Sequence, residues 1–301
     1  MNLSRKMLFL LMSVSIAVGT SACKESVDEL LNSTENSDDT GSGDTGSGGG
    51  ETNDEDDSDE GTETSEIECY GSDETDIDDD VPDWVKDNFH CSRIYTMTEN
   101  NVEYLVIETD DVPNHGSPYH GADSEYYEDV PDGNREQNFD LEEQDFVIKF
   151  PLTPTTDDPA VTVPGACGVA VNGVVFYQGS SSTGSLDDEL ETMDNGNGHV
   201  AGGSLQYHYH GTPLYVEDYQ TALLGIMLDG YPIYGEKEED GTEPTDLDES
   251  GDDPTFGHTH ATSHFPNGMF HYHIRDWDNF GVPILPNSMQ GDASSQAQVS
   301  N

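Results

Sequence analysis

Basic residues are scarce in this chain: nine lysines and arginines stand against 63 aspartates and glutamates, which gives a formal net charge of −54 over 301 residues. Such a charge repels the phosphates of nucleic acids and the headgroups of anionic lipids, so we expect no nucleic-acid partner. The acidic side chains are spread through the chain. We interpret most of this charge as a solvated acidic surface suited to a salty medium, and it also favours cationic or metal partners.

The chain also lacks an apolar run long enough for a permanent transmembrane helix. Its N-terminus instead has two basic residues followed by a short apolar run over residues 7–18, which predicts an export signal at residues 1–22. Residues 20–23 then resemble a lipobox in which Cys23 carries a lipid; a plain cleaved signal peptide is the alternative. We therefore expect an exported lipoprotein of the cell envelope, anchored to a membrane in the periplasm or at the cell surface.

Cysteine is rare as well, with four residues in the chain. Once Cys23 is assigned to the lipid anchor, Cys69 and Cys91 bracket a short acidic segment and are the candidate disulfide, which suits an oxidising compartment. Cys167 has no obvious partner. We expect it to be a buried small hydrophobic residue rather than a nucleophile.

Ordered catalytic signatures are missing. The sequence contains no His-Glu-x-x-His zinc-protease motif and no Gly-x-Ser-x-Gly nucleophile elbow. A hydrolase or protease assignment therefore has no motif behind it, and the sequence leaves open whether the protein is an enzyme.

Composition divides the chain into segments. Residues 23–80 contain few aromatic residues and many Asp, Glu, Gly, Ser and Thr, which is typical of a flexible, charge-extended tether. Residues 76–83 resemble a calcium loop without its glycine; we interpret them as acidic linker, so calcium binding is not expected. The folded domain is placed at residues 81–290, and the small polar residues 291–301 predict a disordered tail.

Long helical periodicity is nearly absent, and only residues 84–89 and 186–193 could each form a helical turn or two. Short β-branched or aromatic runs bounded by Gly, Pro, Asn and Asp predict strands. These runs are residues 104–107, 146–150, 169–177 and 225–234. Asn172-Gly173 and Asp229-Gly230 are hairpin signals. We expect a mainly β, antiparallel sandwich or barrel-like domain with long loops.

One strand-like phrase occurs twice, as residues 206–210 and 270–274, and each copy contains His-Tyr-His. The similarity extends upstream, because Gly168–Tyr177 aligns without gaps on Gly225–Tyr234. Each of these runs is followed by a Gly-His pair and then by its His-x-His strand. We interpret this pattern as an internal duplication of one hairpin-plus-strand unit.

On these motifs the chain resembles the YHYH-domain proteins, a family named for the phrase at Tyr207–His210. The matching features are Asn172-Gly173, Gly198-His199, the YHYH phrase, Leu224–Gly235, Gly257-His258 and His271-Tyr272-His273. The resemblance covers most of residues 90–285. It implies the architecture of the domain but no chemistry, because the family has no established activity.

Imidazole is a good ligand for zinc and copper, and residues at i and i+2 of a strand lie on one face. If the two His-x-His strands are neighbours, four histidines converge on one ion. The expected metal ligands are His208, His210, His271 and His273, with His199 and His258 from preceding loops adding to or replacing them. The leading hypothesis is therefore an envelope protein that binds copper or zinc.

Other interpretations remain open at this point. The histidines could instead be hydrogen-bonded to carbonyls or to carboxylates such as Asp229, with the tyrosines packed outward. The domain could be a metal-dependent enzyme of unknown substrate, or a surface module that binds glycan or protein. His260 and His264 are loop residues that could serve either use, and a structural or surface role is expected for His115 and His120.

Overall fold

A computed structural model of the chain describes residues 67–155, 160–161, 165–179, 186–249, 254–276, 285–286, 288–291 and 299–300. The expected export signal, Cys23 and most of the expected tether lie outside these residues. Residues 63–301 form one compact unit. Within the described residues, no helix has the length and apolar character needed to cross a membrane.

The described part is mainly β and is built from two large sheets, which confirms the predicted fold class. The five-stranded sheet has the order β1-β2-β3-β4-β15. Its strands are β1 (Asp76–Ile77), β2 (Arg93–Glu99), β3 (Val102–Thr109), β4 (Phe146–Pro151) and β15 (Val299–Ser300). Strands β2 and β3 form a hairpin whose two loop residues, Asn100 and Asn101, both have positive φ. Asparagine tolerates that left-handed conformation, so it suits a two-residue hairpin turn.

The eight-stranded sheet has the order β12-β13-β11-β10-β6-β7-β9-β8. Its strands are β6 (Ala166–Ala170), β7 (Val175–Tyr177), β8 (Gly198–Ala201), β9 (Gln206–Tyr209), β10 (Leu223–Met227), β11 (Pro232–Tyr234), β12 (Gly257–His260) and β13 (Met269–His273). Neither large sheet closes into a barrel within the described residues. Smaller elements complete the described structure: β5 (Ala160–Val161) paired with β14 (Ser288–Met289), the helices α1 (Asp83–Lys86) and α2 (Asp187–Leu190), and the 3-10 turn η1 (Pro118–His120).

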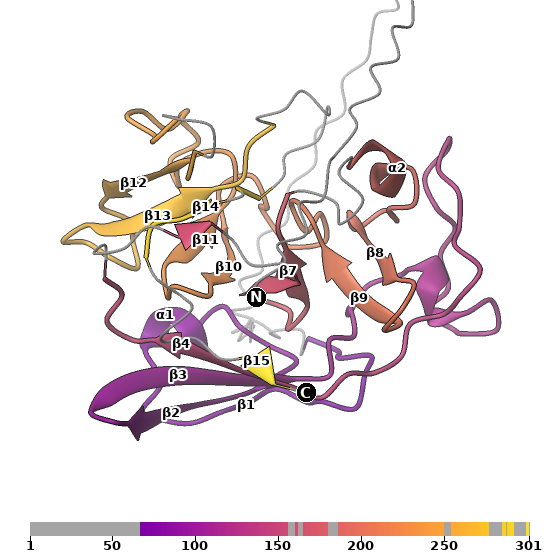
Figure 1. Cartoon of the computed structure of the whole chain (residues 1–301), viewed down its shortest axis with the longest axis horizontal. Helices are drawn as coiled ribbons and strands as arrows, with labels where there is room; N and C mark the ends of the chain where they lie inside the picture. Colours follow the sequence, from indigo (N-terminus) through magenta and orange to yellow (C-terminus); the bar gives the residue numbers. More distant parts are fainter. Residues whose placement is uncertain are drawn as a thin grey trace, which may run out of the picture. The chain divides into compact units, whose positions relative to one another are not determined.

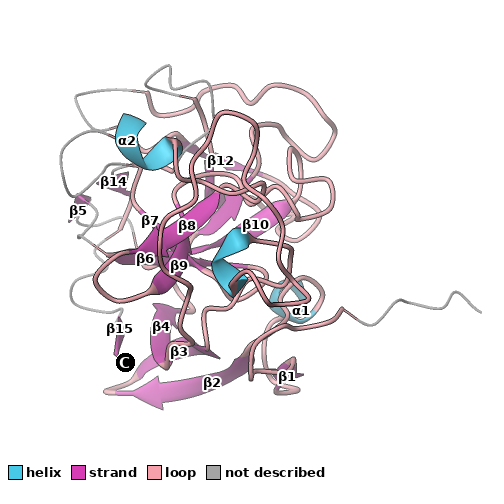
Figure 2. Ribbon diagram, turned by 90° about the vertical axis from the view of Figure 1, so that its right-hand side faces the viewer, coloured by secondary structure: helices cyan, strands magenta, loops and turns pink. Residues whose placement is uncertain are grey.

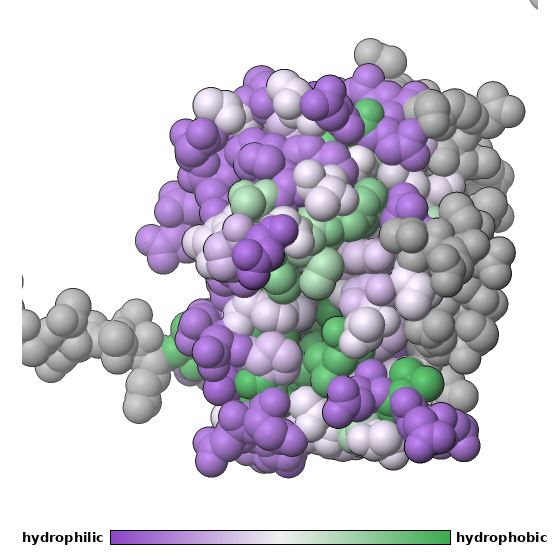
Figure 3. Space-filling model, turned by 90° about the vertical axis from the view of Figure 1, so that its left-hand side faces the viewer, coloured by the Kyte–Doolittle hydropathy of each residue, from purple (hydrophilic) through white to green (hydrophobic). Residues whose placement is uncertain are grey.

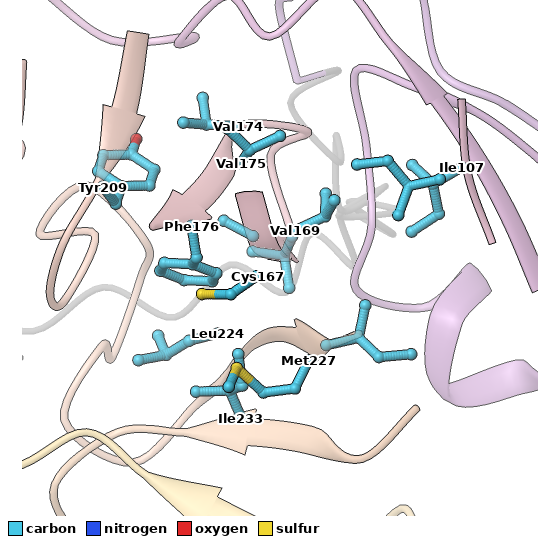
Figure 4. Packing of buried hydrophobic residues seen from close by; sticks show 14 of the residues in the cluster. Ile107, Cys167, Val169, Val174, Val175, Phe176, Tyr209, Leu224, Met227 and Ile233 are labelled. Carbon is cyan, nitrogen blue, oxygen red and sulfur yellow. The ribbon is translucent and has the colours of Figure 1, made fainter. Parts of the chain in front are cut away.

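The two large sheets lie against each other, with the five-stranded sheet below the eight-stranded one in Figures 1 and 2. Fully buried Ile107 of β3 belongs to the same apolar cluster as Val169 of β6 and Phe176 of β7, and Figure 4 shows Val169 between the other two. Burying one such side chain contributes roughly 1.5–3 kcal/mol. This shared core fixes the eight-stranded sheet, and with it the strands that carry the histidines.

The internal duplication is visible in the strand order and pairing. Each half of the eight-stranded sheet has an antiparallel hairpin, a parallel step to the His-x-His strand and an antiparallel outer strand. The halves meet where β6 pairs antiparallel with β10. The halves therefore run outward in opposite directions from the centre of the sheet.

The two hairpin turns also share their hydrogen bonds. In the first turn the Gly173 amide donates to the Ala170 carbonyl, at 3.0 Å, and in the second the Gly230 amide donates to the Met227 carbonyl, at 2.8 Å. Both glycines have positive φ, at 85° and 89°, a conformation that glycine adopts without steric cost. The predicted Asn-Gly and Asp-Gly turns are thus both present.

Structure extends beyond the boundaries expected for the folded domain. Cys69 and Cys91, the pair named from the sequence, form a disulfide, and Arg93 binds the carboxylates of Asp76 and Asp78. Residues 67–80, assigned above to the tether, are therefore held against β2. At the other end, β15 pairs with β4 inside the segment expected to be a disordered tail.

Candidate metal centres

The two His-x-His strands lie in different halves of the eight-stranded sheet. Four strands, β7, β6, β10 and β11, separate β9 from β13. Figure 1 shows β13 toward the left edge of the sheet and β9 toward the right edge. The expectation that four histidines converge on a single ion is therefore wrong. The structure instead brings three histidines together in each half.

The first cluster consists of His199, His208 and His210. His199 on β8 is the register partner of His208 on β9. The Nε2 atoms of His199 and His208 lie 3.1 Å apart, and those of His208 and His210 also lie 3.1 Å apart. All three side chains are buried, so three imidazole nitrogens face one another away from bulk solvent.

Hydrogen bonds on the outer side of these rings settle which nitrogen carries the proton. His210 Nδ1 lies 2.7 Å from the Gln178 carbonyl, which can only accept. His199 Nδ1 lies 2.8 Å from the hydroxyl of Thr192, whose own proton goes to the Glu189 carbonyl. Both histidines therefore donate from Nδ1, and their Nε2 atoms present lone pairs to the cluster. His208 makes a longer contact of the same kind, 3.4 Å, with the Gln206 carbonyl.

The second cluster consists of Glu238, His258, His271 and His273, and it repeats this geometry in the other half. His258 on β12 is the register partner of His271 on β13. The Nε2 atom of His258 lies 3.1 Å from that of His271 and 3.3 Å from that of His273. The second Gly-His pair thus completes a three-histidine group in the same way as the first.

The Nδ1 atoms of the second cluster also face carbonyl oxygens. The distances are 2.8 Å from His258 to Thr245, 3.1 Å from His271 to Met269 and 2.7 Å from His273 to Gly235. Met269 and Gly235 occupy the positions of Gln206 and Gln178 in the first half. The duplication therefore extends from the histidines to the groups that orient them, an arrangement typical of metal-ligating histidines.

A carboxylate accompanies each cluster, and neither was predicted from the sequence. Glu238 Oε1 lies 3.2 Å from His258 Nε2 and 3.9 Å from His273 Nε2. Glu189 Oε2 in the first half lies 3.2 Å from His210 Nε2. Glu238 joins its histidines in a set of four ligand atoms, all within 4.8 Å of one another.

Residues 147–250 match the family model described as YHYH protein. The chain therefore contains a YHYH domain. This match confirms the resemblance drawn from the motifs. No curated protein and no solved structure matches the chain. The matched range of the YHYH domain contains the whole first cluster, whereas in the second cluster only Glu238 falls within it.

The Gly-His pairs of the YHYH domain open strands β8 and β12 rather than lying on loops, which corrects the expectation for His199 and His258. A Cβ atom at Gly198 would lie 2.1 Å from the Tyr207 hydroxyl, and one at Gly257 would lie 2.2 Å from the Phe270 ring. An aromatic residue on the neighbouring strand thus occupies the space over each glycine. This contact explains why glycine precedes the histidine in both halves.

Burial favours the neutral form of four of these histidines. Together with the smaller effect of neighbouring imidazoles, it lowers the pKa of His271 to about 4 and that of His273 to about 3. The pKa values of His199 and His208 are lowered in the same direction, again mainly by burial. Neutral imidazole is the form that binds metal ions.

The tyrosines between the histidines point inward. Tyr209 and Tyr272 are fully buried, so the alternative in which they pack outward is wrong. The Tyr209 hydroxyl accepts a hydrogen bond from Asn172, and Tyr272 donates to the carboxylate of Asp229. Asn172 and Asp229 are equivalent positions of the two hairpin turns. The Asp229 carboxylate therefore accepts a hydrogen bond from Tyr272, and not from a histidine as the non-metal interpretation of the sequence expected.

The remaining histidines lie outside the two clusters. His115 is buried, lies 2.8 Å from the Tyr209 hydroxyl and stacks on Tyr215, and His120 contacts the His115 carbonyl. These contacts agree with the structural role expected for both. His264 lies 2.9 Å from the Tyr234 hydroxyl. His260 is not a loop residue as expected, because it is the last residue of β12.

Cys167, on β6, is a free and fully buried cysteine in the apolar cluster between the sheets. Burial raises the pKa of its thiol to about 12. A thiol that stays protonated at neutral pH is a poor nucleophile. These observations support the expected packing role.

Proposed function

We propose that this YHYH-domain protein is exported, is anchored to a membrane through a lipid on Cys23, and binds two transition-metal ions, one at each histidine cluster. Copper or zinc is the expected metal. The observation that carries the proposal is the orientation of the imidazoles. In both clusters the Nδ1 atoms face acceptors outside the cluster, while the Nε2 atoms converge at 3.1–3.3 Å.

Converging lone pairs repel one another unless a cation or a proton lies between them. A tetrahedral ion with metal–nitrogen bonds of ~2.0–2.1 Å separates its ligand nitrogens by about 3.3–3.4 Å, which is near the separations in both clusters. The acceptors at Nδ1 leave no ring proton for the space between the Nε2 atoms. A metal ion accounts for both the spacing and the tautomers.

The donor set restricts the class of metal. Three neutral imidazoles with a nearby carboxylate suit zinc and copper, whereas calcium and magnesium prefer sets built from oxygen. The Glu238 carboxylate supplies one negative charge against a divalent ion in the second cluster. The donor chemistry thus supports the metals expected from the motif.

Export and anchoring are supported by the signal-like residues 1–22 and by Cys23. The Cys69–Cys91 disulfide agrees with an oxidising compartment. Replacing Cys23 by Ser should release the protein from the membrane fraction and abolish incorporation of labelled fatty acid. Retention of both properties by the variant would contradict the lipid anchor.

Elemental analysis of the purified exported protein tests metal binding directly. We expect close to two equivalents of copper or zinc in the parent, and none in a variant with His208, His210, His271 and His273 changed to Ala. Circular dichroism of the variant checks that the sheets persist, since most of the apolar core is unchanged. A parent that neither contains metal nor takes it up at micromolar concentration would contradict the proposal.

A further inference from the structure

The second cluster adjoins a pocket of about 510 Å³ that lies against the edge strand β12. Glu238 and His258 belong both to the cluster and to the wall of the pocket. The wall also contains the carboxylates of Asp240, Glu243 and Asp246, and it includes no lysine or arginine among its described residues. Figure 3 shows mainly hydrophilic residues over the upper part of this side of the protein, where β12 lies. Such a pocket attracts cations.

His260 connects this pocket to the cluster. It follows His258 by two residues on β12, so the two side chains share a face of the strand. Its Nδ1 lies 3.2 Å from Glu238 Oε2, while Oε1 of the same carboxylate lies 3.2 Å from His258 Nε2. The His260 side chain is 53% exposed, against 8% for His258. One carboxylate thus bridges an exposed imidazole and a buried one.

The first half of the sheet lacks this bridge. Strand β8 pairs with β9 in the same register as β12 with β13, so the position of His260 is filled by Ala201. Alanine offers no ligand atom. The three histidines of the first cluster are all at most 4% exposed. The difference between the halves is therefore the exposed imidazole of His260 beside the second cluster.

We propose that the second cluster takes up and releases a hydrated divalent transition-metal ion through the acidic pocket, with His260 and Glu238 as the entry ligands. Among the described residues, the first cluster has Ala201 in place of this second imidazole, and it holds its ion much longer. This inference rests on the proposed metal-binding function. The ion first binds His260 Nδ1 and Glu238 Oε2 and gives up part of its water shell, while the ring proton of His260 exchanges through solvent from Nδ1 to Nε2, so the imidazole stays neutral. It then passes to Glu238 Oε1 and the three Nε2 atoms.

The test is the rate of zinc transfer from the full exported protein to a chromophoric chelator, followed by stopped-flow absorbance. The parent should release one equivalent quickly and one slowly. A variant with His208 and His210 changed to Ala should keep only the fast phase, and one with His271 and His273 changed to Ala only the slow phase. These two variants assign each phase to its cluster.

His260→Ala should slow the fast phase by about tenfold while the amount of bound zinc stays the same. Thr259→Ala is the matched control, because Thr259 lines the same pocket on the same strand but is not an entry ligand. His260→Asn is a second variant, which keeps a hydrogen-bonding group near Glu238 but is a poor metal ligand. It should be as slow as His260→Ala.

Two outcomes would overturn the inference while leaving the proposed function in place. One is release of both equivalents at the same rate in the parent. The other is an unchanged fast phase in both His260 variants. Absence of bound zinc from the parent would instead overturn the proposed function together with this inference.

Discussion

The two halves of the eight-stranded sheet share a scaffold but differ in what surrounds their histidines. Both halves place a Gly-His strand in the same register against a His-x-His strand. In the first cluster the Thr192 hydroxyl accepts the hydrogen bond from His199 Nδ1, whereas in the second cluster every Nδ1 atom faces a backbone carbonyl. The second cluster also includes the Glu238 carboxylate. Duplication thus preserved the triangle of histidines, whereas the loops between the strands and the last residue of each outer strand, Ala201 or His260, differ.

The largest expected effect comes from breaking one half alone. Changing His208 and His210 to Ala should remove one equivalent of metal and leave the affinity of the second cluster unchanged, because four strands separate the clusters. Isothermal titration of this variant with zinc measures the number of sites and their affinity. His120→Gln is the control, because His120 lies outside both clusters. Loss of both equivalents would mean that the clusters are coupled or share one ion.

Replacing the carboxylates sharpens the comparison. Glu238→Gln should weaken metal binding at the second cluster by roughly 100-fold, because Glu238 Oε1 faces two of its imidazoles. Glu189→Gln should weaken the first cluster less, because Glu189 lies 3.2 Å from His210 Nε2 but is not one of the three converging ligand atoms of that cluster, whereas Glu238 is one of the four of the second. Competition with a chelator of known affinity measures both constants. Equal effects of the two substitutions would contradict the assigned difference.

The orienting groups provide a smaller and very specific test. Thr192→Val removes the hydroxyl that accepts from His199 Nδ1, and it should weaken the first cluster by about tenfold. Thr245→Val is the matched control, because His258 uses the Thr245 backbone carbonyl, which the substitution retains. Titration of both variants should show an effect for Thr192 only. A comparable loss in the Thr245 variant would argue against orientation through Nδ1.

The hairpin turns give a test of stability rather than of metal binding. Burial raises the pKa of Asp229 from its ordinary value of 3.8 to about 6, so the folded state binds this proton more tightly than the unfolded state. This contribution to stability is complete below pH ~4 and is lost as the pH rises through about 6. Asp229→Asn, which introduces the residue of the first turn, should remove it.

Denaturant unfolding at pH 4 and pH 7 measures this difference. The stability of the parent relative to the Asp229→Asn variant should fall by about 2–3 kcal/mol between the two pH values, since one unit of pKa corresponds to ~1.4 kcal/mol. A difference that does not change with pH would show that Asp229 is ionised in the folded state at both values.

Local pattern predicted much of this structure from the sequence. The runs at residues 104–107 and 146–150 became β3 and β4, and both duplicated hairpins formed with the expected turns. The two short helical segments are also confirmed by α1 and α2. Alternation placed the paired histidines of each phrase on one face, because side-chain direction along a strand is a local property.

Strand order could not be predicted in the same way. The duplication showed that two equivalent units exist, but not that β6 would pair with β10 and place the His-x-His strands far apart. That pairing depends on contacts distant in sequence. Glu238 and Thr192 lie outside the strands, and nothing in the pattern separated Glu238 from the other 62 acidic residues. The residues near the clusters that the sequence did not predict are therefore those outside the strands.

The most direct test of the central claim is anomalous diffraction from crystals of the zinc-loaded protein. The account predicts two zinc peaks per chain, each about 2.0–2.1 Å from three Nε2 atoms, one set from His199, His208 and His210 and the other from His258, His271 and His273. A single peak shared by β9 and β13, or ordered imidazoles in both clusters with no peak between them, would contradict it.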